Sequence, residues 1–151
     1  MTYGWAILVA LVVLGALIYF GVFSIKNPEF CQMSPGMLCT KSYLSANNSR
    51  LSLTLYNSFS QDMTIVAISC TKRADAAQTC TAERCGANYP PGVVIRKGNS
   101  NTFNITCEDE SGDLTFIAGE GYGGGINVRY YFGNDASSVR IVNGRLYAIA
   151  N

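Results

Sequence analysis

A chain of 151 residues has room for one compact domain and a short additional segment. Its formal net charge of +1 gives no reason to expect a nucleic acid or an acidic substrate as the partner. The sequence contains no histidine, so Ser-His-Asp triads and zinc sites that use histidine are excluded. We therefore expect a protein that is not an enzyme and needs no cofactor.

Residues 1–23 form an apolar segment without a single charged side chain. The apolar residues run consecutively around a helix rather than along one stripe, so the helix has to be surrounded on all sides. At about 1.5 Å per residue it would be about 33 Å long, close to the hydrocarbon thickness of a bilayer. The sequence thus predicts a long N-terminal hydrophobic α-helix that is covered by lipid or by copies of itself.

Three interpretations of this helix compete. A cleaved secretory signal would have a charged start and a small-x-small cleavage site, and neither is seen. A plain membrane anchor fits the aromatic residues near both ends, which resemble an interfacial belt. A helix that packs with its own copies fits the small residues, which let backbones approach closely. The residues expected in such a polymer core are Tyr3, Gly4, Trp5, Ala6, Leu8, Ala10, Leu11, Val12, Gly15, Ala16, Tyr19 and Phe20.

The predicted helix ends near Ser24, because Asn27-Pro28 is a helix breaker. Beyond this point the chain is rich in Ser, Thr, Asn and Gly, with short β-branched and aromatic runs between turn residues. We therefore divide the chain into a helical segment, residues 1–25, and an extracellular head, residues 26–151.

The head is predicted to be an antiparallel β-sandwich of the Ig-like kind. Leu51, Leu53 and Leu55 alternate with polar residues, as in a strand with one buried face. Further strands are predicted over residues 63–70, 93–96, 102–107, 113–118, 126–132, 139–142 and 146–149. Residues 97–100 and Asn143-Gly144 are predicted to be tight hairpin turns. Short strands at roughly ten-residue spacing are typical of a sandwich, so the expected fold class is α+β.

All six cysteines lie in the predicted head. An even number of cysteines among polar loops, after a segment that meets the membrane, favours disulfides formed outside the cell. Six cysteines allow 15 pairings. Locality favours Cys31 with Cys39, Cys80 with Cys85, and Cys70 with Cys107. The alternative, a metal site made of cysteines alone, lacks a Cys-x-x-Cys pair.

Two Asn-x-Ser/Thr sequons begin at Asn47 and Asn104, and N-linked glycans are expected on an exported head. Asn47 is predicted to lie in a loop. Asn104 is predicted to point outward from a strand whose Phe103 and Ile105 point inward.

Three weaker motifs suggest other chemistry. Residues 119–124 satisfy the G-x-G-x-x-G pattern, but a strand-like run follows where a nucleotide site needs a helix, so a flexible glycine-rich loop is favoured. Residues 108–110 and Asp113 are acidic, but their spacing is not that of an EF-hand, which favours a solvated turn over a calcium site. The basic pairs Lys72-Arg73 and Arg96-Lys97 fit subunit contacts or solubility.

The run MTYGWAILV at residues 1–9 resembles the segment that follows the Leu-Glu-Tyr-Leu motif in archaeal type IV pilins with class III signal peptides. The resemblance implies that a prepilin peptidase removes a short leader. It also implies that the pilus assembly machinery transfers the helix from the cytoplasmic membrane into a helical filament of identical subunits. The expected function is therefore that of a structural subunit of an extracellular, adhesive cell-surface pilus. The alternative is a single-pass membrane-anchored surface domain that binds an extracellular partner.

Overall fold

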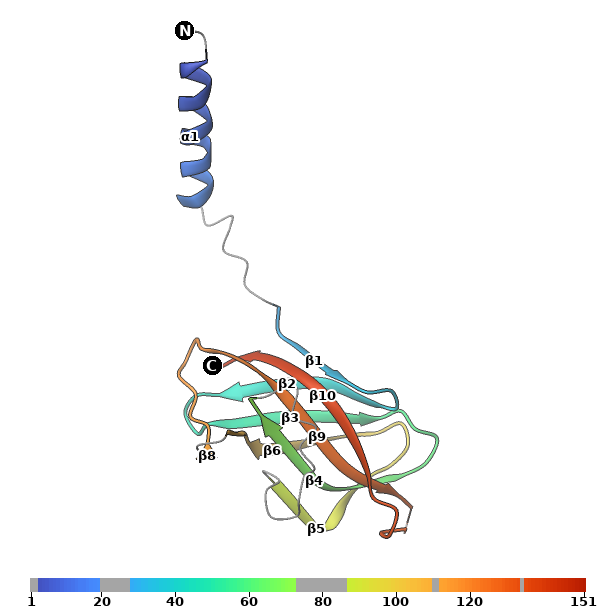
Figure 1. Ribbon diagram of the computed structural model, residues 1–151. Helices are drawn as coiled ribbons and strands as arrows, with labels where there is room; N and C mark the ends of the chain where they lie inside the picture. Colours follow the sequence, from blue (N-terminus) through green and yellow to red (C-terminus); the bar gives the residue numbers. More distant parts are fainter. Residues whose placement is uncertain (1–2, 20–27, 73–86, 110–111, 134) are drawn as a thin grey trace.

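The computed structural model of the chain describes residues 3–19, 28–72, 87–109, 112–133 and 135–151. Its one described helix, α1 (Gly4–Tyr19), stands apart from a head built of β-strands (Figure 1). The C-terminus lies at the end of the head that is nearer to the helix. The boundary predicted at residues 25 and 26 falls outside the described residues, as does the helix end predicted at Ser24.

The predicted α+β class with a long hydrophobic helix is wrong, because the described part of the chain is mostly β and contains one short helix. The helix α1 has 16 residues. At about 1.5 Å per residue it is about 24 Å long, less than the roughly 30 Å of membrane hydrocarbon. Among the described residues, no helix has the length and apolar character needed to cross a membrane. The prediction failed because an apolar composition shows only that a segment avoids water and does not fix how many of its residues are helical.

The described part of the head contains ten strands in two sheets. In sheet A the order is β1 (Phe30–Met33), β10 (Arg140–Ile149), β9 (Gly121–Phe132), β4 (Met63–Thr71), β7 (Glu108–Asp109) and β8 (Gly112–Asp113), with β5 (Ala87–Ile95) also paired to β4. In sheet B the order is β2 (Met37–Ser45), β3 (Arg50–Asn57) and β6 (Ser100–Thr106). The Ig-like arrangement of four strands against three is therefore not found.

The two sheets pack on each other through one hydrophobic core. Alternation along β3 turns Leu51, Leu53 and Leu55 inward, as predicted, and all three side chains are fully buried. Ile65 and Ile126 of sheet A belong to the same cluster and are also fully buried. Burial of each such side chain adds about 1.5 to 3 kcal/mol to the free energy of unfolding, so the hydrophobic core between the sheets supplies much of the stability of the head.

The turn predicted at Asn143-Gly144 is wrong, because one strand, β10, runs through both residues. Gly144 pairs with Ile126 of β9 on one side and with Met33 of β1 on the other. A side chain at Gly144 would collide with the Met33 sulfur and would come 2.7 Å from the carbonyl oxygen of Gln32. Glycine is present here because β1 approaches closely, and not because the chain turns.

The hairpin predicted at residues 97–100 is also wrong. A turn exists there, with the Asn99 N–H donating to the Arg96 carbonyl at 3.0 Å, but it connects the two sheets. β5 pairs with β4 of sheet A, whereas β6 pairs with β3 of sheet B. Backbone hydrogen bonds of 2.9 Å join Asn57, at the end of β3, to Gly98 and Asn99. These bonds hold the crossover against sheet B.

The strand predicted at residues 113–118 is wrong beyond Asp113, where β8 ends. The next N–H groups donate to loop partners instead of a neighbouring strand: Leu114 to the Cys107 carbonyl at 2.8 Å, and Phe116 to the Ser49 hydroxyl at 3.3 Å. Phe116 is nevertheless buried, with its ring packed edge-on against Tyr122.

The glycine-rich loop predicted at residues 119–124 is a strand from Gly121 onward, because β9 begins there. A Cβ atom on Gly121 would lie 2.5 Å from the Tyr147 hydroxyl. A Cβ atom on Gly124 would collide with the Tyr122 hydroxyl and with the Thr71 carbonyl oxygen. The glycines therefore make room for aromatic rings in a sheet, which is a packing role.

Two disulfides join the pairs that locality favours, Cys31 with Cys39 and Cys70 with Cys107. The first ties β1 of sheet A to β2 of sheet B. The second ties the end of β4 to the residue after β6, so it also links the two sheets. Both are compatible with an extracellular or otherwise oxidising location. The predicted pair of Cys80 and Cys85 lies outside the described residues.

Candidate functional site

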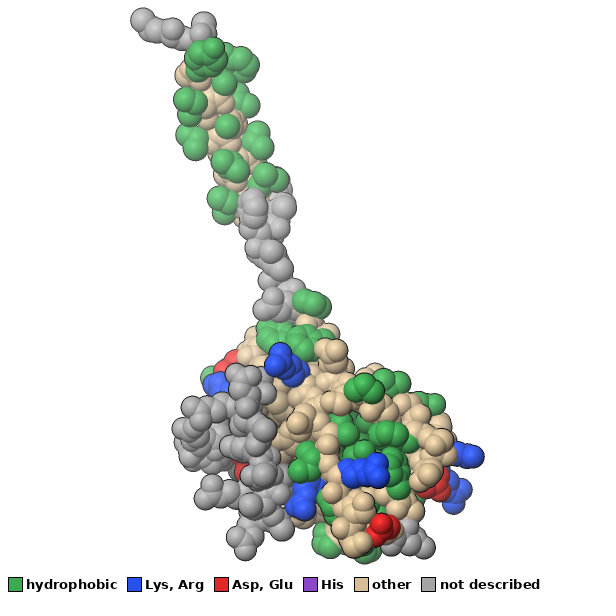
Figure 2. Space-filling view, turned by 45° about the vertical axis from the view of Figure 1, so that its right-hand side comes forward, with side chains coloured by type: hydrophobic (Ala, Val, Ile, Leu, Met, Phe, Trp, Pro, Cys, Tyr) green, Lys and Arg blue, Asp and Glu red, His purple; other side chains and the backbone are tan. Residues whose placement is uncertain are grey.

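The surface of α1 is apolar on all sides and none of its side chains is buried. Figure 2 shows hydrophobic side chains along the whole visible length of the helix. Val12 at the middle of the helix is 63% exposed and Leu8, one turn earlier, is also 63% exposed. A helix with such a surface is not stable alone in water, because soluble monomers rarely expose contiguous apolar patches of more than a few hundred Å².

Every expected polymer core residue that the structure describes is exposed. These residues are Tyr3, Gly4, Trp5, Ala6, Leu8, Ala10, Leu11, Val12, Gly15, Ala16 and Tyr19. Phe20 lies outside the described residues. The described residues of the head therefore bury none of these eleven residues.

Gly15 is not required by close packing against any described residue of the chain. A Cβ atom placed on it would meet nothing within 4 Å. Glycine in a helix interior costs roughly 1 kcal/mol of stability relative to alanine. A glycine that lowers the stability of its own helix, with open space around it, is expected where another backbone approaches closely.

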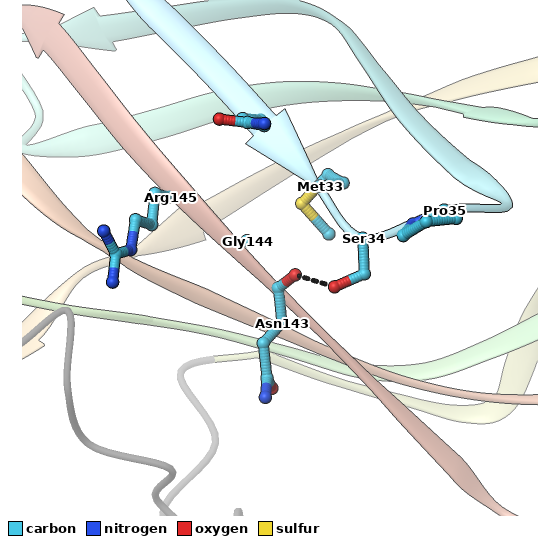
Figure 3. A pocket seen from close by; sticks show the side chains of 7 residues that line it. Met33, Ser34, Pro35, Asn143, Gly144 and Arg145 are labelled. Atoms are coloured by element: carbon cyan, nitrogen blue, oxygen red, sulfur yellow. Dashed lines mark hydrogen bonds between the residues drawn. The ribbon is translucent and has the colours of Figure 1, made fainter.

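The head carries a pocket of about 500 Å³ where the end of β1 meets the middle of β10 (Figure 3). It is lined by Gln32, Met33, Ser34, Pro35, Asn143, Gly144 and Arg145. In Figure 3 the side chains of Met33, Asn143 and Arg145 surround Gly144, which has no side chain of its own. We name this feature the β1–β10 pocket.

Hydrogen bonds fix the rim of the β1–β10 pocket. The Ser34 hydroxyl and the Ser34 N–H both donate to the Asn143 carbonyl, at 2.9 Å and 3.1 Å. By contrast, no hydrogen bond or ion pair with another described residue engages the side-chain ends of Gln32, Asn143 and Arg145. The backbone of the rim is thus held in place while its polar side chains are available to a ligand.

Both sequon asparagines are exposed, one on a strand of sheet B and one in a turn that connects two of its strands. Asn47 lies in the turn between β2 and β3, as predicted. Asn104 points outward from β6, while Phe103 and Ile105 on either side point into the core, also as predicted. Both side-chain amides are therefore accessible to a modifying enzyme.

One buried tyrosine hydroxyl in the head has no hydrogen-bond partner among the described residues. It belongs to Tyr89 of β5, whose ring packs edge-on against Phe103 of sheet B at 5.3 Å. Burial raises the pKa of Tyr89 above its usual value of 10, because it disfavours the charged form. The hydroxyl therefore stays neutral at physiological pH and serves packing between the sheets.

The weaker motifs do not form chemical sites in the described residues. No helix follows the glycines of residues 119–124, because β9 continues to Phe132. Glu108 and Asp113 pair across β7 and β8, and no metal-binding cluster of three or more acidic, cysteine or histidine residues is found in the described part of the chain. Lys72, Arg96 and Lys97 are exposed. Glu110 and Arg73 lie outside the described residues.

Sequence reasoning missed the β1–β10 pocket entirely. Its two sides are far apart in the chain, since Ser34 and Asn143 are separated by 109 residues. The signal that the sequence did contain, Asn143-Gly144, was interpreted as a turn. None of the known protein-family models matches this chain, and a search among curated proteins finds no matching sequence.

Proposed function

We propose that this protein is the structural subunit of an extracellular filament of the archaeal type IV pilus kind, in which α1 packs with the α1 helices of identical subunits. The observation that carries the proposal is an exposed helix that is apolar on every side and receives no cover from its own head. A helix with one apolar stripe would fit one partner surface, whereas a helix apolar all round fits the interior of a bundle.

Close packing between helices favours assembly. Before assembly the helix surface is covered by lipid, which is as apolar as a bundle, so the hydrophobic effect alone does not favour the transfer. Gly15 and its small neighbour Ala16 allow another backbone to approach, and dispersion contacts then accumulate along the helix. Contacts between heads add to this gain.

The two disulfides support an extracellular position for the heads. Disulfides persist outside the cell and are rare in the cytosol. They limit unfolding in a compartment without chaperones, because a cross-link reduces the freedom of the unfolded chain. From the resemblance at residues 1–9, maturation by a prepilin peptidase and export by the pilus assembly machinery belong to this proposal.

N-linked glycans at Asn47 and Asn104 would cover one side of the head, sheet B. We expect the protein purified from its natural source to have an intact mass above the value calculated from the sequence. Asn47→Gln and Asn104→Gln should each lower that mass by one glycan. Asn101→Gln, on the same strand as Asn104 but outside any sequon, is the control and should leave the glycan mass unchanged. A mass equal to the unmodified chain contradicts glycosylation.

The direct test is electron microscopy of material sheared from cells that produce the protein. Thin, uniform fibres are expected, and mass spectrometry of the purified fibres should identify this chain as their main component. Deletion of the gene should remove the fibres, and a plasmid copy should restore them. If the sheared material contains no fibres, or if the fibres persist in the deletion strain, the filament proposal is wrong.

A further inference from the structure

We propose that the β1–β10 pocket and the aromatic pair beside it bind an acidic saccharide, a sugar chain that carries carboxylate groups. This binding activity belongs to the head and is separate from assembly through α1. The volume of the β1–β10 pocket, about 500 Å³, falls within the range of roughly 300 to 1,000 Å³ that is usual for small-molecule sites. The observation behind the proposal is that three kinds of group suited to such a ligand lie on one face of one strand pair.

The first kind of group is planar and polar. Gln32 of β1 pairs directly with Arg145 of β10, and Asn143 lies two residues further along β10. Residues two apart in a strand point to the same face, and all three side chains are exposed. Amides donate and accept hydrogen bonds at once, which matches the hydroxyl groups of a sugar. The Ser34 hydroxyl donates a hydrogen bond to the Asn143 carbonyl, so its oxygen lone pairs remain as acceptors for a ligand.

The second kind of group is aromatic. Phe30 pairs with Tyr147 in the same ladder, and their rings are nearly parallel, with centroids 6.3 Å apart and planes 20° apart. Tyr147 rests against Gly121 and Gly123 of β9. A Cβ atom on Gly121 would lie 2.5 Å from the Tyr147 hydroxyl, so a side chain there would displace the ring, whereas a Cβ atom on Gly123 would be in ordinary contact with it at 3.7 Å. Phe30 is 48% exposed. The rings provide an apolar surface for the C–H face of a pyranose ring, next to the polar groups of the pocket.

The third kind of group is a cation. Among the described residues that line the pocket, Arg145 is the one with a charged side chain, and none is acidic. A guanidinium forms paired hydrogen bonds with a carboxylate, which makes it selective for that group. The closest acidic residue in sequence to the aromatic pair, Glu29, is engaged elsewhere, since its carboxylate accepts the N–H of Ile149 at 3.0 Å. Charge therefore favours an acidic sugar over a neutral one.

The pocket is held ready for a ligand by the loop that the Cys31–Cys39 disulfide closes. Four lining residues, Gln32 to Pro35, lie inside this loop. Gly36 follows with φ of +100°, and the ring of Phe59 occupies the place that a side chain there would take. Because this pocket wall is already fixed, it loses little conformational entropy when a ligand binds, and this raises the affinity for the ligand.

The test is titration calorimetry of the full-length protein in detergent with tetragalacturonic acid. We expect saturable binding, and at least tenfold weaker binding of the fully methyl-esterified tetrasaccharide, which has the same sugars without the charges. Arg145→Gln should weaken binding of the acid at least tenfold, and Phe30→Ala should weaken binding of both forms. Arg50→Gln is the matched control, because Arg50 is also exposed but lies on sheet B. The affinity of this variant for the acid should equal that of the parent protein.

Several outcomes would overturn the proposal. These are the absence of binding, equal affinity of the acid and its methyl ester, and equal affinity of the Arg145→Gln and Arg50→Gln variants for the acid. Equal affinity for a tetra-aspartate peptide would assign the pocket to an acidic peptide instead. Circular dichroism of each variant should match the parent protein, since every substituted side chain is exposed or half-exposed. Fibre formation is not measured here, so failure of either proposal leaves the other intact.

Discussion

Val12→Asp is expected to abolish fibre formation while leaving the head folded. Val12 lies at the centre of α1 and is 63% exposed, and no side chain of α1 is buried, so a carboxylate there does not disturb the fold of the head. In a bundle of helices the same carboxylate is surrounded by apolar side chains. An acidic residue at the centre of a membrane helix costs about 3 kcal/mol, and in a filament every subunit adds this cost. Negative-stain microscopy of sheared material measures the result.

Two control variants separate this effect from a general effect of the substitution. Val12→Leu keeps the apolar surface and should give normal fibres. Val94→Asp introduces the same charge at a head position with a similar exposure of 57%, and it should also allow fibres. Normal fibres from Val12→Asp would contradict assembly through α1.

Gly15→Asp provides an independent second test. Aspartate has a higher helix propensity than glycine, so the substitution does not weaken α1 itself. An added Cβ atom meets nothing within 4 Å in the chain. Loss of fibres from a Gly15→Asp variant that is exported in normal amounts therefore arises from contacts with other subunits.

Removal of the Cys70–Cys107 disulfide is expected to have the largest effect on the stability of the head. The two cysteines are 1% and 0% exposed, and the Tyr122 hydroxyl donates to the Cys70 sulfur at 3.2 Å. The bond closes a loop with a sequence separation of 37, for which chain entropy predicts about 4 kcal/mol of stabilisation. Cys70→Ala combined with Cys107→Ala should lower the free energy of unfolding by at least this amount, as measured by urea denaturation of the full-length protein in detergent.

The Cys31–Cys39 disulfide supplies the matched comparison. Its sequence separation is only 8, for which the same estimate is about 2.5 kcal/mol, and its cysteines are only partly buried. Cys31→Ala combined with Cys39→Ala should therefore destabilise the head less. If the two double variants lose equal stability, the long loop and the buried position of the Cys70–Cys107 bond do not contribute as argued.

The predictable parts of the fold are those in which a local pattern and the tertiary structure agree. The alternation of Leu51, Leu53 and Leu55 identified β3, because period-two burial leaves a direct mark in the sequence. The outward position of Asn104 followed from the same rule. Locality was sufficient to predict the Cys31–Cys39 disulfide, whereas Cys70 and Cys107 were paired because both lie at the ends of predicted strands.

Glycine residues account for the main errors in the prediction of the head from the sequence. Gly144 and Gly121 were assigned to a turn and a loop, yet both lie in strands. Each is there because another group, the Met33 sulfur or the Tyr147 ring, occupies the space of its side chain. A single sequence does not distinguish a glycine that bends the chain from one that admits a neighbour, since the neighbour is distant in the sequence. The same ambiguity hid the β1–β10 pocket.

β2 and β6 lie at the two edges of sheet B, and such edges can recruit stray strands from other chains. In β2 the register with β3 shifts between Cys39 and Lys41, and Lys41 adds an exposed charge. An interrupted, charged border is a poor template for another strand. The β2 edge therefore disfavours the addition of a strand from a neighbouring chain, so heads at high local concentration are not expected to join into one continuous sheet through β2.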